Sequence, residues 1–300
     1  MNAIELGATL YTPGLHPTAL SNAYGAIAHQ RSMVICLEDA VRDDQIDLAE
    51  ENLAEILNAF RAKKPSIHVF IRPRNIEMLV RILKMRGVET VAGFVLPKVT
   101  TLSLASWLSV LVHEQHAFMP TIEGDEAFDL TALSRLRDQL LPYSERIPAI
   151  RIGGNDILNL FAVRRSRVRT AYDGPLSIVI RNITAIFAPH GFGVAAPVFE
   201  HFSDHDLLAQ EVEIDIEHGL MTKTAVHPSQ IALIQSLYQP SVSEMAEARA
   251  ILDSNAPAVF GSEGSMCEPA THIRWAGGVI QRAQIYGVAD QLISAQCMVA

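Results

Sequence analysis

The sequence predicts an α/β fold, a (β/α)8 barrel followed by a C-terminal helical extension. Short apolar runs alternate with longer stretches of helical periodicity, and most of the short runs are apolar on both faces. Eight such units fit into roughly 230 residues, as a closed barrel requires. A doubly wound open sheet is the alternative, but no Gly-x-Gly-x-x-Gly motif follows the first run.

The expected strands are short and are followed by turn residues. In chain order they span Leu6–Tyr11, Met33–Leu37, Ile67–Arg72, Gly93–Pro97, Ala117–Ile122, Ala149–Ile152, Gly193–Val198 and Thr224–His227. The expected helices lie between and after them: Thr18–His29, Gln45–Ala62, Ile76–Met85, Leu102–His113, Asp125–Leu140, Pro175–Ala188, Asp204–His218 and Pro228–Leu237. Local signals agree with these limits, since Asp44 can cap a helix and Pro175 suits a first helical turn.

The chain continues after the eighth unit. We expect a barrel domain over residues 1–240 and a helical extension over residues 241–300, with helices at Ser243–Asn255 and about Ala270–Tyr286 and a Gly/Ser/Pro-rich stretch between them. The extension is too short to form its own core. It is therefore expected to pack on the barrel or on a neighbouring subunit.

Composition excludes several classes of protein. With 300 residues and 49% hydrophobic content, the chain can close a core and is not disordered. A net charge of −9 argues against nucleic-acid binding, which needs a basic face. Three scattered cysteines (Cys36, Cys267 and Cys297) do not make a disulfide framework. Neither a leader-like segment nor an apolar run of about 20 residues occurs, so we expect a cytoplasmic protein that does not enter the membrane.

Titratable side chains follow six of the expected strands at the point where each strand ends. They are Glu38 and Asp39, Arg72, Lys98, Glu123, Asp156 and His227. The carboxyl ends of barrel strands meet at one rim, where the active sites of such barrels are built. Each residue alone has an ordinary explanation, such as a helix cap or a solvated lysine. Together they indicate a functional site.

The chemistry of these residues favours a divalent metal. Glu123 and Asp156 follow adjacent strands, so their carboxylates can meet on one cation, and such oxygen ligands suit Mg²⁺, with Mn²⁺ as the alternative. Zn²⁺ would call for more histidine or cysteine. Arg72 offers a planar fork to a substrate carboxylate. A metal ion and an arginine fit a 2-oxoacid, with the ion stabilising an enolate as a C–C bond breaks or forms.

A cluster of arginines follows the sixth strand. Arg164, Arg165, Arg167 and Arg169 stand out in an acidic protein. They predict a phosphate clamp, with Arg165 binding a CoA, nucleotide or sugar-phosphate substrate. A solvated loop paired with surface acids is the alternative.

Several segments, in their order along the chain, resemble the citrate lyase β-subunit-like branch of the HpcH/HpaI aldolase/citrate lyase superfamily. They are Leu-Glu-Asp-Ala-Val, Ile-Arg-Pro, Leu-Pro-Lys, Ile-Glu-Gly, Gly-Gly-Asn-Asp and Val-His-Pro-Ser-Gln-Ile. The resemblance implies a TIM barrel, Mg²⁺ held by Glu123 and Asp156, a carboxylate-binding Arg72, and a homo-oligomer, often a trimer, with a hexamer as the alternative. Members of this branch cleave or form C–C bonds beside a 2-oxoacid, commonly in CoA thioesters such as citryl-CoA or malyl-CoA.

Two further strings, Met-Cys-Glu-Pro-Ala-Thr-His and Ala-Pro-Val-Phe-Glu, resemble a C–C bond lyase subgroup associated with tellurite-resistance gene clusters. The chain also departs from the superfamily pattern. Its first strand lacks the Arg-Ser pair that relatives carry before Pro-Gly. Glu268 stands where relatives have an aspartate that acts as acid or base in a neighbouring subunit's site.

We therefore expect a Mg²⁺-dependent C–C lyase or aldolase acting on a 2-oxoacid-derived small molecule or its CoA ester. Arg72, Lys98 and Arg165 are expected to bind the substrate. Glu38 or Asp39, or Glu268 from a neighbour, is expected to move the proton. The alternatives are a class II aldolase for a free or phosphorylated oxoacid aldol and a noncatalytic barrel in a biosynthetic complex.

Overall fold

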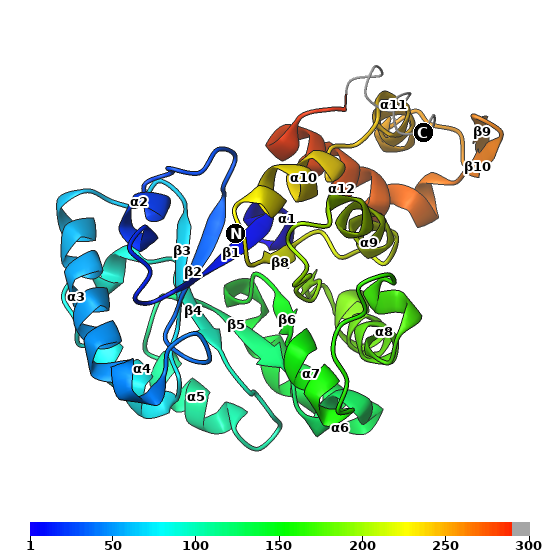
Figure 1. Ribbon diagram of the computed structural model, residues 1–300. Helices are drawn as coiled ribbons and strands as arrows, with labels where there is room; N and C mark the ends of the chain where they lie inside the picture. Colours follow the sequence, from blue (N-terminus) through cyan, green and yellow to red (C-terminus); the bar gives the residue numbers. More distant parts are fainter. Residues whose placement is uncertain (290–300) are drawn as a thin grey trace. The chain divides into compact units, whose positions relative to one another are not determined.

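The computed structural model describes residues 1–289, which form two compact units, Met1–Ile234 and a second that begins at Gln235. The first unit contains eight parallel strands in the order β7-β6-β5-β4-β3-β2-β1-β8. A backbone bridge between Ala196 and Lys223 brings the two ends of this sheet together. The predicted (β/α)8 barrel is therefore confirmed, and the helices of this unit lie outside its strands (Figure 1).

The observed elements follow the predicted order. The strands are β1 (Ala8–Pro13), β2 (Ser32–Cys36), β3 (His68–Arg72), β4 (Gly93–Leu96), β5 (Ala117–Ile122), β6 (Ile150–Ile152), β7 (Val194–Ala195) and β8 (Lys223–Ala225). The main helices that follow them are α2 (Ala19–Ala23), α3 (Ile46–Ala62), α4 (Ile76–Ile82), α5 (Leu104–Leu111), α6 (Leu130–Leu140), α7 (Gly154–Leu160), α8 (Leu176–Phe187), α9 (His205–Glu217) and α10 (Ser229–Leu237).

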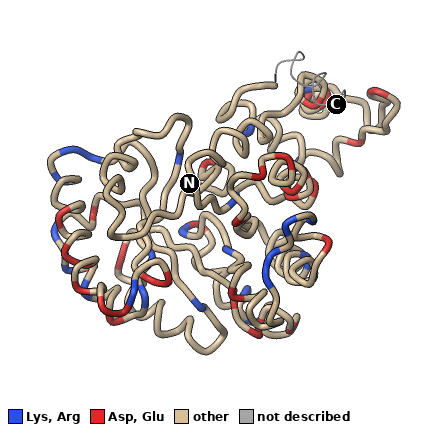
Figure 2. Tube along the Cα trace, in the orientation of Figure 1, with Lys and Arg blue, Asp and Glu red and all other residues tan. Residues whose placement is uncertain are grey.

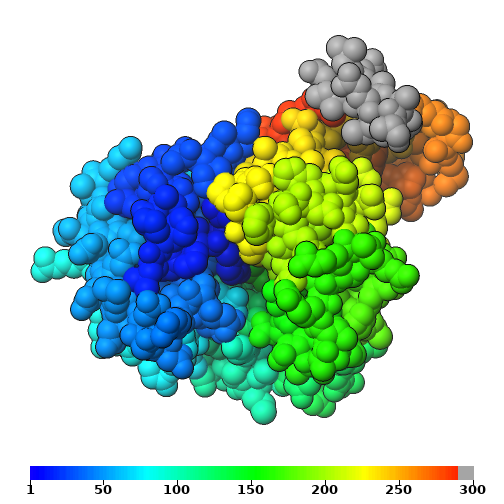
Figure 3. Space-filling model, viewed as in Figure 1, coloured from blue at the N-terminus to red at the C-terminus, as the bar shows by residue number. Residues whose placement is uncertain are grey.

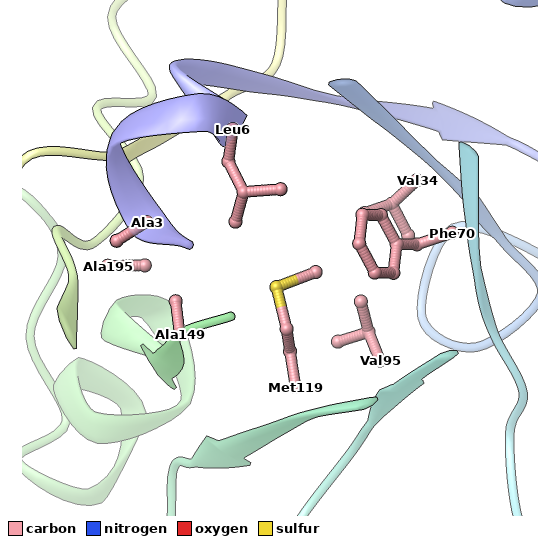
Figure 4. Packing of buried hydrophobic residues seen from close by; sticks show 8 residues of the cluster. All are labelled: Ala3, Leu6, Val34, Phe70, Val95, Met119, Ala149 and Ala195. Atoms are coloured by element: carbon pink, nitrogen blue, oxygen red, sulfur yellow. The ribbon is translucent and has the colours of Figure 1, made fainter. Parts of the chain in front are cut away.

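Apolar side chains fill the barrel beneath the strand ends. Figure 4 shows one side chain from each of six strands or their edges meeting Ala3 and Leu6: Val34, Phe70, Val95, Met119, Ala149 and Ala195. All eight are buried. Because these side chains fill the interior, a polar cavity is expected at the carboxyl ends of the strands.

Leu6 was expected to begin the first strand, and that prediction was wrong. Ala3–Leu6 is instead a short helix, α1, closed by a capping box between Asn2 and Glu5. Gly7, at φ 61°, turns the chain into β1. Leu6 is thereby directed into the barrel core and closes it from the amino-terminal end of the strands, where the Ser32 hydroxyl donates to its carbonyl at 2.7 Å.

Three other elements differ from the prediction. Helix α2 is shorter, because Gly25 adopts φ 80° and ends the helical stretch. Strand β7 has two residues, and the chain leaves the sheet at Pro197. Helix α7 was not expected, since two glycines disfavour a helix start. It forms because Ile157 and Leu158 are buried on one side of the helix.

The second unit has its own elements and its own apolar cluster. Helix α11 (Val242–Leu252) and helix α12 (Pro269–Tyr286) flank a hairpin of β9 (Phe260–Ser262) and β10 (Ser265–Cys267). The cluster consists of Met245, Ala248, Ile251, Cys267, Ala276 and Val279. The hairpin was missed because its turn, Glu263-Gly264, lacks the usual Asn-Gly or Asp-Gly pair, although both residues have positive φ.

The limit between the units falls within α10, at Ile234. The predicted limit at residue 240 and the packing of the extension on the barrel or a neighbour stay predictions. Cys297 lies outside the described residues. Within residues 1–289 no helix is both long and apolar enough to cross a membrane.

A buried ionic cluster joins α9 to the barrel wall. Lys223 Nζ on β8 lies 2.9 Å from Glu211 Oε1 and 2.8 Å from Asp215 Oδ2, both on α9. Arg165 also pairs with Glu211, and the Tyr172 hydroxyl donates to Asp215 at 2.6 Å. Burial lowers the pKa of Lys223, but two cations facing two carboxylates balance the charge. The cluster fixes the segment after α7 against α9 and β8.

Replacing Lys223 with methionine should therefore cost about 3–5 kcal/mol of unfolding free energy, because Glu211 and Asp215 would stay buried without their shared cation. Urea denaturation followed by circular dichroism measures this loss. The exposed Lys84→Met is the matched control and should change stability by less than about 0.5 kcal/mol. Equal stability of the two variants would contradict the structural role of the cluster.

Candidate active site

A cavity of about 410 Å³ opens at the carboxyl ends of the strands. Figure 3 shows the blue and the green segments on the left and right of the barrel unit, and both supply residues to the lining of this cavity. The charged residues in its lining are Asp39, Arg72, Glu123, Arg151 and Asp156. Five of the predicted strand-end residues, counting Lys98 at its edge, are thus gathered at one mouth of the barrel.

Arg72, the last residue of β3, lies at the centre of this group. Its Nη2 is 2.9 Å from Glu38 Oε2 and 3.1 Å from Glu123 Oε1. Burial by itself would lower the pKa of Arg72, but Tyr11 and the two carboxylates together raise it. The guanidinium is therefore permanently charged and already engaged with two carboxylates, one that follows β2 and one that follows β5.

Glu123 follows β5 and is almost fully buried. The Lys98 backbone N–H donates to its Oε1 at 2.7 Å, an approach made with Lys98 at φ 50°. Burial raises the pKa of Glu123 to about 7, while Arg72 opposes this shift and the negative charge of Asp156 adds to it. A cation placed between Glu123 and Asp156 would relieve this repulsion.

Gly153 makes room for the Glu123 side chain. A Cβ atom on Gly153 would lie 2.3 Å from both Cβ and Oε2 of Glu123, which no side chain tolerates. The glycine at the end of β6 is therefore a steric requirement of this carboxylate. The same strand end continues directly into α7, which carries Asp156 in its first turn.

The donor set fits Mg²⁺ or Mn²⁺. Across residues 1–289 no three His, Cys, Asp or Glu side chains are arranged to hold a metal by themselves. An ion at this cavity would therefore have Glu123 and Asp156 as protein ligands and take its other ligands from water and substrate. Mg²⁺ is commonly held by one or two carboxylates in this way, whereas Zn²⁺ needs a fuller set of protein ligands.

Glu38 and Asp39 are adjacent in sequence but differ in environment. Lys98 Nζ lies 2.7 Å from Glu38 Oε1. Burial raises the pKa of Glu38, but a hydrogen bond from Asp39, the charge of Arg72 and the contact with Lys98 outweigh it and lower the pKa to about 2. The Asp39 side chain is 60% exposed. Partial burial and the neighbouring Glu38 raise its pKa to about 6.

The structure places the other predicted residues elsewhere. Arg165 is buried against Glu211, and the exposed Arg164 pairs with Glu200 at 3.3 Å in the basic segment visible in Figure 2. Both line a smaller cavity of about 210 Å³ that shares Asn155 with the main one. The ring of His227 stacks on Phe202, and its Nδ1 lies 2.8 Å from Ser229 Oγ.

Glu268 belongs to the second unit, where it precedes α12 and its Oε2 accepts a hydrogen bond from Thr271 at 3.2 Å. Its role in proton transfer and the role of Arg165 in substrate binding stay predictions. Sequence reasoning missed Arg151, Thr121, Tyr11 and Thr224, which line the cavity from within the barrel. For Arg151 a signal existed, because a single arginine interrupts the apolar run Ala-Ile-Arg-Ile.

The fold and the site define a barrel protein with an acidic, arginine-containing cavity at its strand ends. The chain belongs to the C-C_Bond_Lyase family of the TIM-barrel fold, whose family model matches residues 1–288. This match confirms the predicted resemblance to the citrate lyase β-like C–C lyases.

Individual relatives are distant. A (3S)-malyl-CoA thioesterase of Cereibacter sphaeroides is 24% identical over 250 residues, which are 79% of this chain and 78% of that protein. A citrate lyase from Burkholderia xenovorans has TM-score 0.71 at 18% identity, over 99% of this chain and 97% of that one. CitE from Mycobacterium tuberculosis, solved with magnesium, acetoacetate and coenzyme A, has TM-score 0.68 at 19% identity, over 94% and 99% of the two chains.

We predict that Gly153→Ala displaces the Glu123 carboxylate, costs about 1–3 kcal/mol of stability and weakens Mg²⁺ binding at least tenfold. The neighbouring Gly124→Ala is the control, since a Cβ there would meet nothing within 4 Å. Thermal unfolding and Mg²⁺ calorimetry on both variants measure the two effects. Normal Mg²⁺ affinity in Gly153→Ala would show that Glu123 does not need this space.

Proposed function

We propose that the protein is a Mg²⁺-dependent C–C bond lyase that cleaves a 2-oxoacid-derived substrate in the aldol sense, with Mn²⁺ able to replace Mg²⁺. One observation carries the proposal: Glu123 and Asp156 line one cavity at the barrel mouth, and Arg72 and Lys98 hold the surrounding carboxylates. Membership of the C–C bond lyase family supports the same reaction class.

Glu123 and Asp156 are the residues that would hold the ion. When bound, the ion supplies Lewis-acid stabilisation for negative charge that develops on the substrate oxygens. Arg72 donates to both carboxylate oxygens of Glu123, at 3.1 and 3.3 Å, and so orients the carboxylate for this role. Lys98 Nζ, at the edge of the cavity, adds positive charge that can attract an anionic group of the substrate.

The structure favours Asp39 over Glu38 as the residue that moves the proton. Glu38 is held by Arg72 and Lys98 and stays ionised down to about pH 2. Asp39 lines the cavity, has an exposed carboxyl group and a pKa of about 6, and can exchange a proton through its Oδ atoms near neutral pH. Glu268 from a neighbouring subunit of a homo-oligomer is the alternative proton carrier.

Two relatives point to CoA thioesters as the substrate class. One is named a malyl-CoA thioesterase, and another was solved with coenzyme A. The first name also makes thioester hydrolysis a second candidate function for this cavity. Lyase and thioesterase activities differ in which bond breaks, so their products distinguish them.

With Mg²⁺ present, we expect the protein to release a 2-oxoacid from citryl-CoA or malyl-CoA, with free hydroxy acids offered in the same panel for comparison. Glu123→Gln should lose this activity and bind Mg²⁺ at least tenfold more weakly in calorimetry with a 2-oxoacid present, because one of two carboxylate ligands is neutralised. The exposed Glu145→Gln is the matched control and should behave like the wild type.

Other products would overturn the proposal. Free CoA thiol together with the intact hydroxy acid identifies a thioesterase. Turnover of free or phosphorylated aldols alone identifies a class II aldolase. Mg²⁺ binding without turnover of any substrate in the panel supports a noncatalytic barrel.

The pH dependence tests the role of Asp39. The plot of kcat/KM against pH should show an ionisation near pH 6 that disappears in Asp39→Asn, with kcat lowered by about 10²–10⁴-fold. An unchanged profile in Asp39→Asn, with the ionisation lost in Glu268→Gln, would assign the proton transfer to Glu268 instead.

A further inference from the structure

Arg151 differs from the other buried arginines. Four arginines are buried within the part of the chain that the structure describes. Three of them have carboxylate partners: Arg72 with Glu38 and Glu123, Arg165 with Glu211, and Arg282 with Glu244. Among residues 1–289 no carboxylate oxygen lies within 4.0 Å of the Arg151 guanidinium. An unpaired buried charge is costly to a folded protein, so this group calls for an anion.

The position of Arg151 shows where that anion would sit. Arg151 is the middle residue of β6, is 1% exposed and lines the 410 Å³ cavity. Its Nη2 donates to Thr224 Oγ1 at 2.6 Å, and its Nη1 lies 3.7 Å from Met119 Sδ, a weak acceptor. Its guanidinium carbon lies 5.2 Å from the centre of the Tyr11 ring, which orients the fork in the cavity wall.

Thr121 adds a second unsatisfied group beside it. Thr121 on β5 is the register partner of Arg151, so the two side chains point to the same face of the sheet. It is 2% exposed and lines the same cavity. Within the described residues its hydroxyl has no hydrogen-bond partner. Two adjacent strands thus line the cavity with a guanidinium that lacks a carboxylate partner and a hydroxyl that lacks a hydrogen-bond partner.

We propose that Arg151 and Thr121 form a subsite for a second carboxylate of the substrate, which makes the substrate a dicarboxylic 2-oxo or 2-hydroxy acid unit. The inference rests on the proposed function, because it assigns the second anionic end of the molecule bound in that cavity. Arg72 is already paired through its Nη2 with Glu38 and Glu123, whereas Arg151 has no carboxylate partner among the described residues. Arg151 therefore determines specificity, and the metal ligands do not.

Paired ligands that differ only in the second carboxylate test this subsite. Calorimetry in the presence of Mg²⁺ compares malate with 2-hydroxybutyrate, and 2-hydroxyglutarate with 2-hydroxypentanoate, as matched enantiomers. In the wild-type protein the dicarboxylate of at least one pair should bind ten times more tightly or better. Arg151→Gln should reduce this ratio to within threefold of one and leave the Kd of the monocarboxylate within threefold of its wild-type value.

Two further variants keep the test decisive. Thr121→Val removes one hydroxyl at constant shape and should lower the ratio severalfold, even where Arg151→Gln fails to fold. The exposed Arg86→Gln removes the same charge outside the cavity and should leave the ratio unchanged. Equal affinities within both pairs in the wild type, or a ratio that survives both Arg151→Gln and Thr121→Val, would overturn the subsite while leaving the proposed function standing. If none of the four acids binds with Mg²⁺, the subsite is overturned, and the product assay on citryl-CoA and malyl-CoA decides the proposed function separately.

Discussion

The pairing of Arg72 with Glu123 and Glu38 connects the ends of β3, β5 and β2 at the barrel mouth. Without the guanidinium, burial would drive both carboxyl groups toward their neutral forms. With it, Glu38 stays ionised, and Glu123 is held between the opposing effects of burial and Arg72. One guanidinium thus sets the position and the charge of both carboxylates.

Two charged networks lie on either side of the β8 wall and have different consequences. Lys223 points outward to α9, where two cations meet two carboxylates and nothing remains to be bound. The next residue, Thr224, points inward and accepts a hydrogen bond from Arg151, whose charge has no nearby carboxylate. A network in which every charge has a partner stabilises the fold, whereas a charge without a partner at a cavity can bind a ligand. The alternation of side chains along a strand separates the two.

The sequence predicted the features that arise from a repeating pattern, but it did not predict those that depend on a single contact. Eight apolar runs and their helices predicted the barrel, and the strand-end positions brought Glu38, Arg72 and Glu123 together as expected. Leu6 could not be told from a strand residue, because only the turn at Gly7 directs it into the core. The pairing of Arg165 with Glu211 was not foreseen, because the two residues lie 46 positions apart in the sequence. Arg151 was overlooked because the sequence does not show that this single charge in an apolar run lacks a carboxylate partner.

The backbone conformation of Lys98 indicates that this rim of the barrel is built around the two carboxylates that Lys98 contacts. A positive φ at a residue other than glycine costs free energy and persists where the surrounding contacts demand it. At φ 50° Lys98 donates its backbone N–H to Glu123 and extends its Nζ to Glu38, so one residue orients both carboxylates that share Arg72. Arg72 and Lys98 both pair with these carboxylates, whereas Arg151 lines the cavity without a carboxylate partner among the described residues. The residue that recognises the substrate's second carboxylate is therefore separate from Arg72 and Lys98, which hold Glu123. A substitution on β6 can change specificity without disturbing Glu123.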